Sequence, residues 1–455
     1  MNSFVTQSRL LGTRPVVLNT LNISRPAAGE PTLLLITQGF GDALRIGYQN
    51  RPKIFARRIV LPEMLYARVE EITERMAANG EVLVPLDESD ARLKMRTAHD
   101  AGIPSVAIVL MHGYRFPAHE RRLKAIAQVL GFAQISVSHE VSPLIKLVSR
   151  GDTTVVDAYL SPLLRRYVAQ VAGDLKGVKL MFMQSNGGLT AADRFQGKDA
   201  ILSGPAGGIN GMARTSEQAL GQGARLIGFD MGGTSTDVSH YAGRFELVDE
   251  SVVAGVRIRA PMMQIHTVAA GGGSICRFDG MRFRVGPQSA GARPGPACYR
   301  NGGPLTVTDC NLFLGRIEPE RFPAVFGPDG DQPLDPDASR ARLQEVADAL
   351  GNAKSLEAIA EGFLEIAVDN MAAAIRKISI ARGHDVTLLP FYTPTLTDEE
   401  RKVVETLDLG KIYAMGAHPV IVNSLARSMG YRRSDYRPLL AESAVTPGRT
   451  RWRKS

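Results

Sequence analysis

A short run of glycines, hydroxyls and carboxylates is the part of this chain best suited to chemistry. Residues 228–238 read Gly-Phe-Asp-Met-Gly-Gly-Thr-Ser-Thr-Asp-Val. Glycines let the backbone approach a ligand closely, and successive N–H groups in such a turn form a concave nest for an anion. Hydroxyl groups add donors, and flanking carboxylates can hold a hydrated Mg²⁺ that bridges phosphate oxygens. The run therefore predicts a phosphate-binding turn, although a tight turn without a ligand can also use Gly-Gly-Thr.

The predicted roles divide this run into a phosphate cradle and a metal site. The cradle is predicted to consist of Gly232, Gly233, Thr234, Ser235 and Thr236. Asp230 or Asp237 is predicted to hold the metal, and Asp237 is also a candidate catalytic carboxylate. No Gly-Lys-Ser/Thr sequence follows the glycines, so the run is not a P-loop.

Two strands must position this turn. The apolar residues 225–229 predict a buried strand before it, and residues 238–248 have the mixed texture of a second strand. Residues 202–208 are expected to form a glycine-rich loop before a helix that ends near Leu220, and a helix N-terminus suits an anion. Residues 268–275 predict a second glycine-rich turn.

Alternating strand and helix patterns fill the N-terminal third of the chain. Strands are expected at 32–37, 105–111 and 134–137, and helices at 62–80, 90–100 and 119–130. The near-continuous apolar character of 105–111 is typical of a sheet covered on both faces. This alternation predicts an α/β fold. The pattern of apolar and polar residues changes around 141–150, where we place a domain boundary. Long helices are expected from residue 153, at 338–350 and at 355–382.

Composition narrows the class of protein. The formal net charge is +8, but residues 431–455 carry +5 of it, so the body of the chain shows no basic stripe for nucleic acid. The three cysteines occur singly, which argues for a reducing compartment and against structural zinc. No apolar run approaches the roughly 20 residues needed to span a bilayer. We therefore expect a cytoplasmic protein without nucleic-acid or membrane partners.

Several isolated residues are weaker candidates for chemistry. His112 and His119 flank a turn and could ligate a metal, but no third ligand stands at a defined spacing. His266 precedes a glycine turn and is a candidate acid or base. Cys298 is a candidate nucleophile without an identifiable base. Arg293 could clamp a carboxylate, or it could be a solvated loop residue.

The chain closely resembles the hydantoinase A/5-oxoprolinase family, and most closely its ATP-hydrolysing 5-oxoprolinases. The matching segments, in order over about 360 residues, are IGYQNRP (46–52), MHGYRFPAHE (111–120), SRGDTTVVDAYLSP (149–162), MQSNGGL (183–189), LSGPAGG (202–208), FDMGGTSTDVS (229–239), HTVAAGGGSICRFDG (266–280), RVGPQSAGARPGPACYRNGG (284–303) and LTVTDCNLFLGRI (305–317). The resemblance implies an actin-like ATPase (ribonuclease H-like) α/β architecture with mixed sheets and flanking helices. It also implies ATP and Mg²⁺ as cofactors, and ATP-coupled opening of a cyclic amide such as 5-oxo-L-proline to L-glutamate, through phosphorylation of the amide oxygen.

In this family interpretation, further residues line the nucleotide cleft. They are Gly207, Gly208, Gly271, Gly272 and Gly273. The resemblance also implies a hydantoinase B-type subunit or domain as partner, a lactam as substrate, and an oligomer. An N-methylhydantoinase or ketone carboxylase subunit of the same fold is the alternative.

The chain also departs from the family pattern. Members usually begin with another Asp-x-Gly-Gly-Thr-x-Thr-Asp hairpin, which is absent upstream of residue 31, and the resemblance ends near residue 387. The expected organisation is an irregular arm (1–29), a partial N-terminal-type domain (30–147), a hydantoinase A domain (148–387) and an unmatched basic tail (388–455). The expectation is an internal piece of an oxoprolinase, as a truncated or frameshifted gene would give; a non-catalytic remnant is therefore a further alternative.

Overall fold

The computed structural model describes residues 29–49, 55, 57, 63–175, 178–223, 225–253, 255–383 and 391–392. The chain divides into a first compact unit, Met1–Gly207 with Leu247–Met263, and a second, Gly208–Glu246 with Gln264–Ser455. The predicted arm (1–29) and basic tail (388–455) lie outside the described residues, apart from Gly29 and a short strand at 391–392. The predicted domain boundary at 147/148 falls at the start of a helix of the first unit and stays a prediction.

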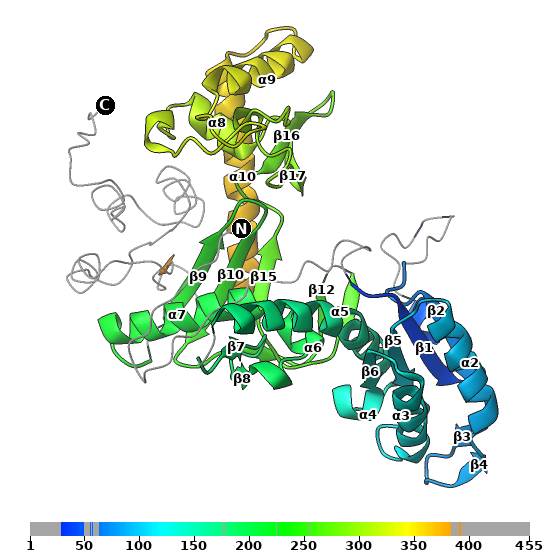
Figure 1. The fold of residues 1–455 in the computed structure, drawn as a ribbon. Coiled ribbons are helices and arrows are strands. Elements are labelled where there is room, and N and C mark those ends of the chain that lie inside the picture. Colours follow the sequence, from blue (N-terminus) through cyan, green and yellow to red (C-terminus); the bar gives the residue numbers. More distant parts are fainter. Residues whose placement is uncertain are drawn as a thin grey trace. The chain divides into compact units, whose positions relative to one another are not determined.

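Parallel strands form the central sheet of the first unit (Figure 1), in the order β2 (Arg68–Ile72), β1 (Thr32–Thr37), β5 (Ser105–Val109) and β6 (Gln134–Val137). The inner strands β1 and β5 are buried along their whole length. Helices α2 (Glu88–Asp100) and α3 (Ala118–Leu130) pack on one face, and α5 (Leu147–Asp174) packs on the other. The α/β prediction is therefore confirmed, because apolar strands such as 105–109 need cover on both faces.

The helix predicted at 62–80 is wrong. Residues 68–72 form β2, and β3 (Arg75–Met76) pairs with β4 (Val82–Val84). The apolar residues of this stretch follow helical spacing and so resemble one face of a helix. Because β2 lies at the sheet edge, it keeps polar residues along its length and lacks the apolar run of a buried strand. Gly80, taken as a helix stop, has a φ of 93° in the turn between β3 and β4.

The remaining elements of the first unit are short. Its helices are α1 (Ala43–Ile46), α4 (Ser138–Val141) and α6 (Gly197–Ala200), with a 3₁₀ turn at Ala192–Arg194. Its small antiparallel ladders pair β7 (Met181–Met183) with β8 (Leu189–Ala191), β11 (Leu247–Val248) with β14 (Met262–Met263), and β12 (Ser251–Val253) with β13 (Val256–Ile258).

A mixed sheet lies at the centre of the second unit, in the order β15 (Ile265–Val268), β10 (Thr236–Ala242), β9 (Arg225–Met231) and β18 (Phe391–Tyr392). Strand β10 is antiparallel to both β9 and β15, whereas β18 is parallel to β9. The predicted helix at 355–382 is confirmed as α10 (Leu356–Ile378), which packs its apolar side on this sheet. Figure 1 shows α10 running behind β10 and β15.

The rest of the second unit packs around α10. It contains the pair β16 (Ser274–Phe278) and β17 (Phe283–Ser289), helices α8 (Val307–Phe313) and α9 (Pro336–Ala349), and 3₁₀ turns at Ala297–Tyr299, Pro319–Arg321 and Ile380–Arg382. Helix α7 (Ser203–Leu220) begins in the first unit and continues in the second. None of the helices in the described residues is long and apolar enough to cross a membrane.

Candidate functional site

The predicted turn connects β9 to β10, and the register of the sheet places both carboxylates on one face. Asp230 on β9 lies directly opposite Asp237 on β10, and Asp237 lies opposite Thr267 on β15. Residues directly opposite each other in antiparallel strands project to the same side, with Cβ atoms about 4.5–5.5 Å apart. The three side chains therefore form a polar row beside the turn.

Two carboxylates lie side by side in this row. Thr267 Oγ1 donates a hydrogen bond to Asp237 Oδ1 at 2.6 Å. Burial raises the pKa of Asp237 to about 6, and the nearby Asp230 charge adds to the rise. Asp230 is exposed, yet partial desolvation of its carboxyl group raises its pKa as well. In the described part of the chain neither carboxylate forms an ion pair.

The tip of the hairpin leaves several donors free. The turn closes with a hydrogen bond from Gly232 N–H to Ser235 O at 2.9 Å. Gly233 and Thr234 are exposed, and their N–H groups donate to no residue that the structure describes. The hydroxyls of Thr234 and Ser235 are likewise without a described partner. These donors can bind an anion at the same end of the hairpin as the two carboxylates.

Thr236 differs from its predicted role in the cradle. Its side chain is fully buried, and its hydroxyl donates to the carbonyl oxygen of Ala270. This bond ties β10 to the start of the second glycine-rich turn. The structure therefore directs the Thr236 hydroxyl into the protein interior, while its neighbours at the tip stay accessible.

The glycines at 271–273 support the hairpin from behind. Gly272 N–H donates to Gly232 O at 3.1 Å, and Gly273 N–H donates to Gly233 O at 2.6 Å. A Cβ atom at Gly271 would lie 2.7 Å from Gly232 O, closer than a carbon and an oxygen can approach. The two backbones therefore pack directly on each other, and this contact by itself requires glycine. The two predicted glycine turns are brought together, but a cofactor contact by 271–273 stays a prediction.

The glycine-rich loop predicted at 202–208 is wrong. Helix α7 begins at Ser203, so Gly207 and Gly208 are helical residues, and a Cβ atom at Gly208 would meet open space. In the second unit α7 runs antiparallel to β9. Met212 of the helix lies against Gly228 of β9. Further along the helix, Glu217 accepts a hydrogen bond from Tyr241, which is opposite the earlier β9 residue Leu226. The Gly208 end of α7 therefore points along β9 toward the turn.

The structure does not bring His266 to the carboxylate face. His266 on β15 lies opposite Val238, whose side chain belongs to the core under α10. Burial and the Lys377 charge on α10 lower the pKa of His266. Its role as an acid or base stays a prediction that the geometry does not support.

The weaker candidates have ordinary partners. His119 Nδ1 lies 2.9 Å from the carboxylate of the buried Glu74, and His112 packs near the Tyr114 ring. Cys298 is fully buried, and burial together with the Asp309 charge raises the pKa of its thiol. Among the described residues no cluster of three or more His, Cys, Asp or Glu side chains could hold a metal. Arg293 is exposed in its loop.

Two further threonines contribute to this region. Thr267 bonds Asp237, and nothing in its local sequence marks it, because only the register of β15 brings it there. Thr308 supports the glycine turn, since both its N–H and its hydroxyl donate to Gly272 O, at 2.8 and 2.9 Å. The sequence leaves the polar stretch 306–311 open as either a ligand-facing segment or a helix cap. The structure forms the cap, because Thr306 and Asp309 make a capping box at the start of α8.

Two family models match the sequence. The hydantoinase/oxoprolinase N-terminal region matches residues 12–131, and hydantoinase/oxoprolinase matches residues 150–393. The 5-oxoprolinase 1 of Arabidopsis thaliana is 42% identical over 78% of this chain, and the 5-oxoprolinase of Saccharomyces cerevisiae is 43% identical over 79%. The caprolactamase subunit alpha of Pseudomonas jessenii is 34% identical over 80%.

The chain spans 31% of the length of both 5-oxoprolinases and 53% of that of the caprolactamase subunit. Solved structures agree in fold. Nucleotide-free acetone carboxylase superposes with a TM-score of 0.70 at 24% identity, and ATP-dependent caprolactamase from Pseudomonas jessenii with 0.67 at 31% identity. Each match covers 89% of this chain and 56% of the other. The chain therefore belongs to the hydantoinase/oxoprolinase family.

Proposed function

We propose that this chain carries the nucleotide-binding part of an ATP-dependent hydrolase that opens 5-oxo-L-proline to L-glutamate. The observation that carries the proposal is the pair Asp230 and Asp237, which flank an open Gly-Gly-Thr-Ser turn. Neither carboxylate forms an ion pair with a basic side chain of the described residues. Relatives named 5-oxoprolinase at 42–43% identity support the choice of substrate. We assign the second unit to the actin-like ATPase architecture, in which such a hairpin binds phosphate.

The donors at this turn fit Mg·ATP. Free N–H groups at Gly233 and Thr234 and the hydroxyls of Thr234 and Ser235 suit phosphate oxygens. Magnesium keeps most of its water shell and needs only one or two carboxylates beside the phosphates. Asp230 alone therefore suffices beside the phosphates, and a bound cation would offset the repulsion between Asp230 and Asp237.

The proposed reaction is activation of an amide oxygen followed by hydrolysis. When bound, Mg·ATP would supply the phosphoryl group that activates the amide carbonyl toward water. Attack of water at this carbon and protonation of the ring nitrogen break the C–N bond, and a second water releases the phosphate to give L-glutamate. The turn would hold the phosphates, and Asp230 would position the cation. Asp237 would accept a proton from the attacking water, because its carboxylate is ionised near neutral pH and lies opposite the cation-binding Asp230.

The remainder of the activity is proposed to need more protein than this chain. The relative named caprolactamase subunit alpha implies partner subunits in that enzyme. We propose a hydantoinase B-type subunit or domain as partner, assembly into an oligomer, and a cytoplasmic location. A ketone carboxylase role is less supported, because acetone carboxylase shares the fold at only 24% identity.

Calorimetric titration of the purified chain with Mg·ATP tests this proposal. We expect binding that is lost in Asp230→Ala and kept in Asp331→Ala, which removes an exposed carboxylate elsewhere in the second unit. Phosphate release would then be measured with a B-type partner and 5-oxoproline, N-methylhydantoin or acetone. Absence of Mg·ATP binding by the wild-type chain, or equal binding by both variants, would overturn the assignment of the turn.

A further inference from the structure

A groove of about 680 Å³ opens in the first unit, and the proposed phosphate site does not use it. Its volume falls within the roughly 300–1,000 Å³ of small-molecule sites. Its walls come from the segment after β1, from α1 and the two residues that follow it, from the segment after β5 and from the start of α5. The lining is mostly apolar and includes Phe40, Ala43, Ile46, Met111, Leu147 and Val148.

The groove lies at the carboxyl ends of β1 and β5, where the chain leaves the sheet toward opposite faces. After β1 the chain enters α1, whose Leu44 packs on the α5 side of the sheet. After β5 it enters α3, whose Leu123 packs on the other side. Such a divergence between adjacent parallel strands opens a crevice, and ligands of open α/β sheets bind there. Phe40 and Met111, which follow the two strands, both line the groove.

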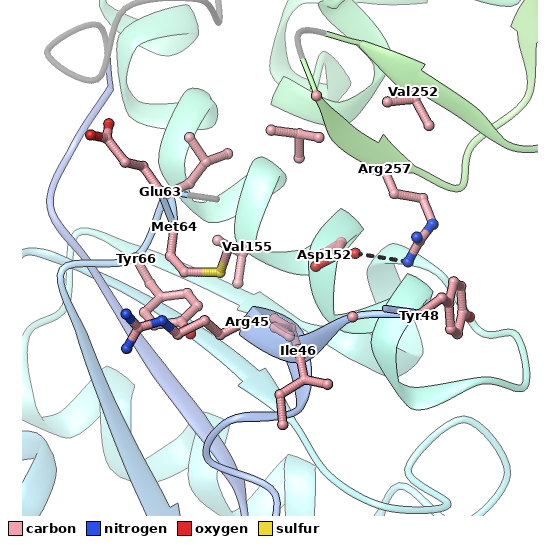
Figure 2. Close-up of a pocket in the computed structure, with 15 residues that line it drawn as sticks. Arg45, Ile46, Tyr48, Glu63, Met64, Tyr66, Asp152, Val155, Val252 and Arg257 are labelled. Atoms are coloured by element: carbon pink, nitrogen blue, oxygen red, sulfur yellow. Dashed lines mark hydrogen bonds and ion pairs between the residues drawn. The ribbon is translucent and has the colours of Figure 1, made fainter. Parts of the chain in front are cut away.

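Tyr48 lines both this groove and a neighbouring pocket beside Asp152 (Figure 2). The Tyr48 hydroxyl lies 2.7 Å from Ser149 Oγ, and the Arg257 guanidinium lies 4.0 Å from the centre of its ring. Figure 2 shows Arg257 between Tyr48 and Asp152, with Ile46 directed away from Asp152. Tyr48 is therefore held from two directions and forms a fixed wall of the groove.

Lys146 supplies the charge of the groove, because the other residues that line it are uncharged. Its ammonium group forms no ion pair or hydrogen bond with a side chain that the structure describes. The neighbouring pocket is different, since Asp152 and Glu63 line it and would repel an anion. The groove therefore combines an apolar wall with one cation that has no described counter-ion.

An aliphatic carboxylate has the two chemical properties that this groove matches. Each CH₂ group that leaves water for an apolar wall raises affinity by a factor of about four. The carboxylate accepts charge-assisted hydrogen bonds from an ammonium group. Ile46 is 51% exposed and Tyr48 is 44% exposed, so an alkyl chain in the groove would cover apolar surface that now faces water. A sugar or a free phosphate would leave that surface unmatched.

We propose that this groove binds a medium-chain aliphatic carboxylate. The chain lies against Phe40, Ile46 and Met111, and the carboxylate pairs with Lys146. The site does not depend on nucleotide binding, and its ligand carries neither the ring nor the amide of the proposed substrate. The first unit therefore has a ligand of its own, in addition to the phosphate turn of the second unit.

Calorimetric titration of the full chain, without nucleotide, tests the alkyl chain and the charge separately. The probes are octanoate, butanoate, which lacks four CH₂ groups, and octanol, which lacks the charge. We expect octanoate to bind at least about tenfold more tightly than butanoate, because the longer chain covers more of the apolar wall. Equal affinity for octanoate and butanoate would overturn the proposal.

A pair of lysine substitutions tests the head group. Lys146→Gln is expected to weaken octanoate binding about 3- to 10-fold, as loss of one accessible charged partner implies, and to leave octanol binding unchanged. Lys179→Gln removes an exposed lysine of the first unit that does not line the groove, and it is expected to change neither. Unchanged octanoate binding by Lys146→Gln, or an equal loss in both variants, would overturn the assignment of the carboxylate.

A pair of valine substitutions tests the location. Val148 lines the groove, whereas Val252 lines the neighbouring pocket. Val148→Trp is expected to block octanoate and Val252→Trp to leave it bound, with a thermal melt to confirm that each variant is folded. Octanoate binding that survives in folded Val148→Trp, or that is lost in Val252→Trp, would overturn the site. The lysine variants decide the question if Val148→Trp does not fold.

Discussion

Asp237 and His266 lie on adjacent strands of one sheet, yet their side chains project from opposite faces. Asp237 pairs with Thr267, and His266 pairs with Val238, one position further along β10. Successive residues of a strand alternate between faces. The two groups that the sequence nominates for catalysis therefore cannot meet at one ligand. His266 instead lies on the α10 side, where burial and the Lys377 charge lower its pKa.

Substitution of Asp237 and of His266 tests separately how the two faces of the sheet contribute to Mg·ATP binding. Asp237→Ala is expected to weaken Mg·ATP binding at least about tenfold, since it removes a charged group beside the cation. His266→Ala is expected to leave the affinity within about twofold, because its side chain projects from the face of the sheet opposite the two carboxylates. Calorimetric titration measures both, and a thermal melt confirms that each variant is folded. A large loss in His266→Ala with an unchanged melt would contradict the placement of the site.

The raised pKa of Asp237 predicts that this carboxylate costs stability. The folded protein holds its proton more tightly than the unfolded chain, whose pKa is near 3.8. The free energy of unfolding therefore falls as pH rises from about 4 to about 6 and stays level above. Asp237→Asn removes this loss, and we expect it to gain about 1–2 kcal/mol at pH 8 and nothing at pH 4. Urea unfolding at both pH values measures the difference.

Asp279 provides a control with the opposite sign. Hydrogen bonds from Arg284 and from backbone N–H groups lower the pKa of Asp279 to about 2. Its contribution to stability is therefore present above pH 4 and disappears as pH falls toward 2. Asp279→Asn is expected to destabilise the protein at pH 7 and not at pH 2. The same direction of change in both variants at neutral pH would refute the assignment for Asp237.

The glycines of the two turns are predicted to serve different purposes, one for stability and the other for ligand binding. A Cβ atom at Gly271 would lie 2.7 Å from Gly232 O and 2.8 Å from Ser235 N, whereas one at Gly233 would meet nothing within 4 Å. Gly271→Ala is expected to cost about 2–3 kcal/mol, because neither backbone can move aside. Gly233→Ala is expected to leave stability nearly unchanged and to weaken Mg·ATP binding at the exposed turn. Chemical unfolding and calorimetry on both variants check this contrast.

The sequence predicts those parts of the fold that depend on local patterns. The apolar runs at 32–37 and 105–109, the glycine turn between two strands, and α10 are all visible as periodicity or punctuation. Glycine-rich segments, however, look alike whatever their role. Those at 202–208 are in a helix, and those at 271–273 pack on another turn, because the distinction depends on partners far along the chain.

The second limit on prediction from the sequence is the face of the sheet from which each strand residue projects. The register between β10 and β15 decides that Thr267 rather than His266 meets Asp237, and a shift by one residue would exchange them.

Asp309 gives the last prediction, on the support beneath the site. Its buried carboxylate accepts hydrogen bonds from the N–H groups of Ala297, Cys298 and Thr306 and from the hydroxyls of Thr306 and Ser339. It thereby joins the 3₁₀ turn, α8 and α9, and α8 begins beside Thr308, which holds Gly272. Every partner is a donor, so an amide in place of the carboxylate would turn N–H groups toward other donors.

We therefore expect Asp309→Asn to cost about 2–4 kcal/mol of the free energy of unfolding. Ser339→Ala, which removes one donor and leaves the others, is expected to cost about 1 kcal/mol. Denaturant unfolding measures both. Because Asp309 lies behind the turn and not at its tip, the folded fraction of Asp309→Asn is expected to keep wild-type affinity for Mg·ATP. Normal stability of Asp309→Asn would show that these bonds do not hold the support together.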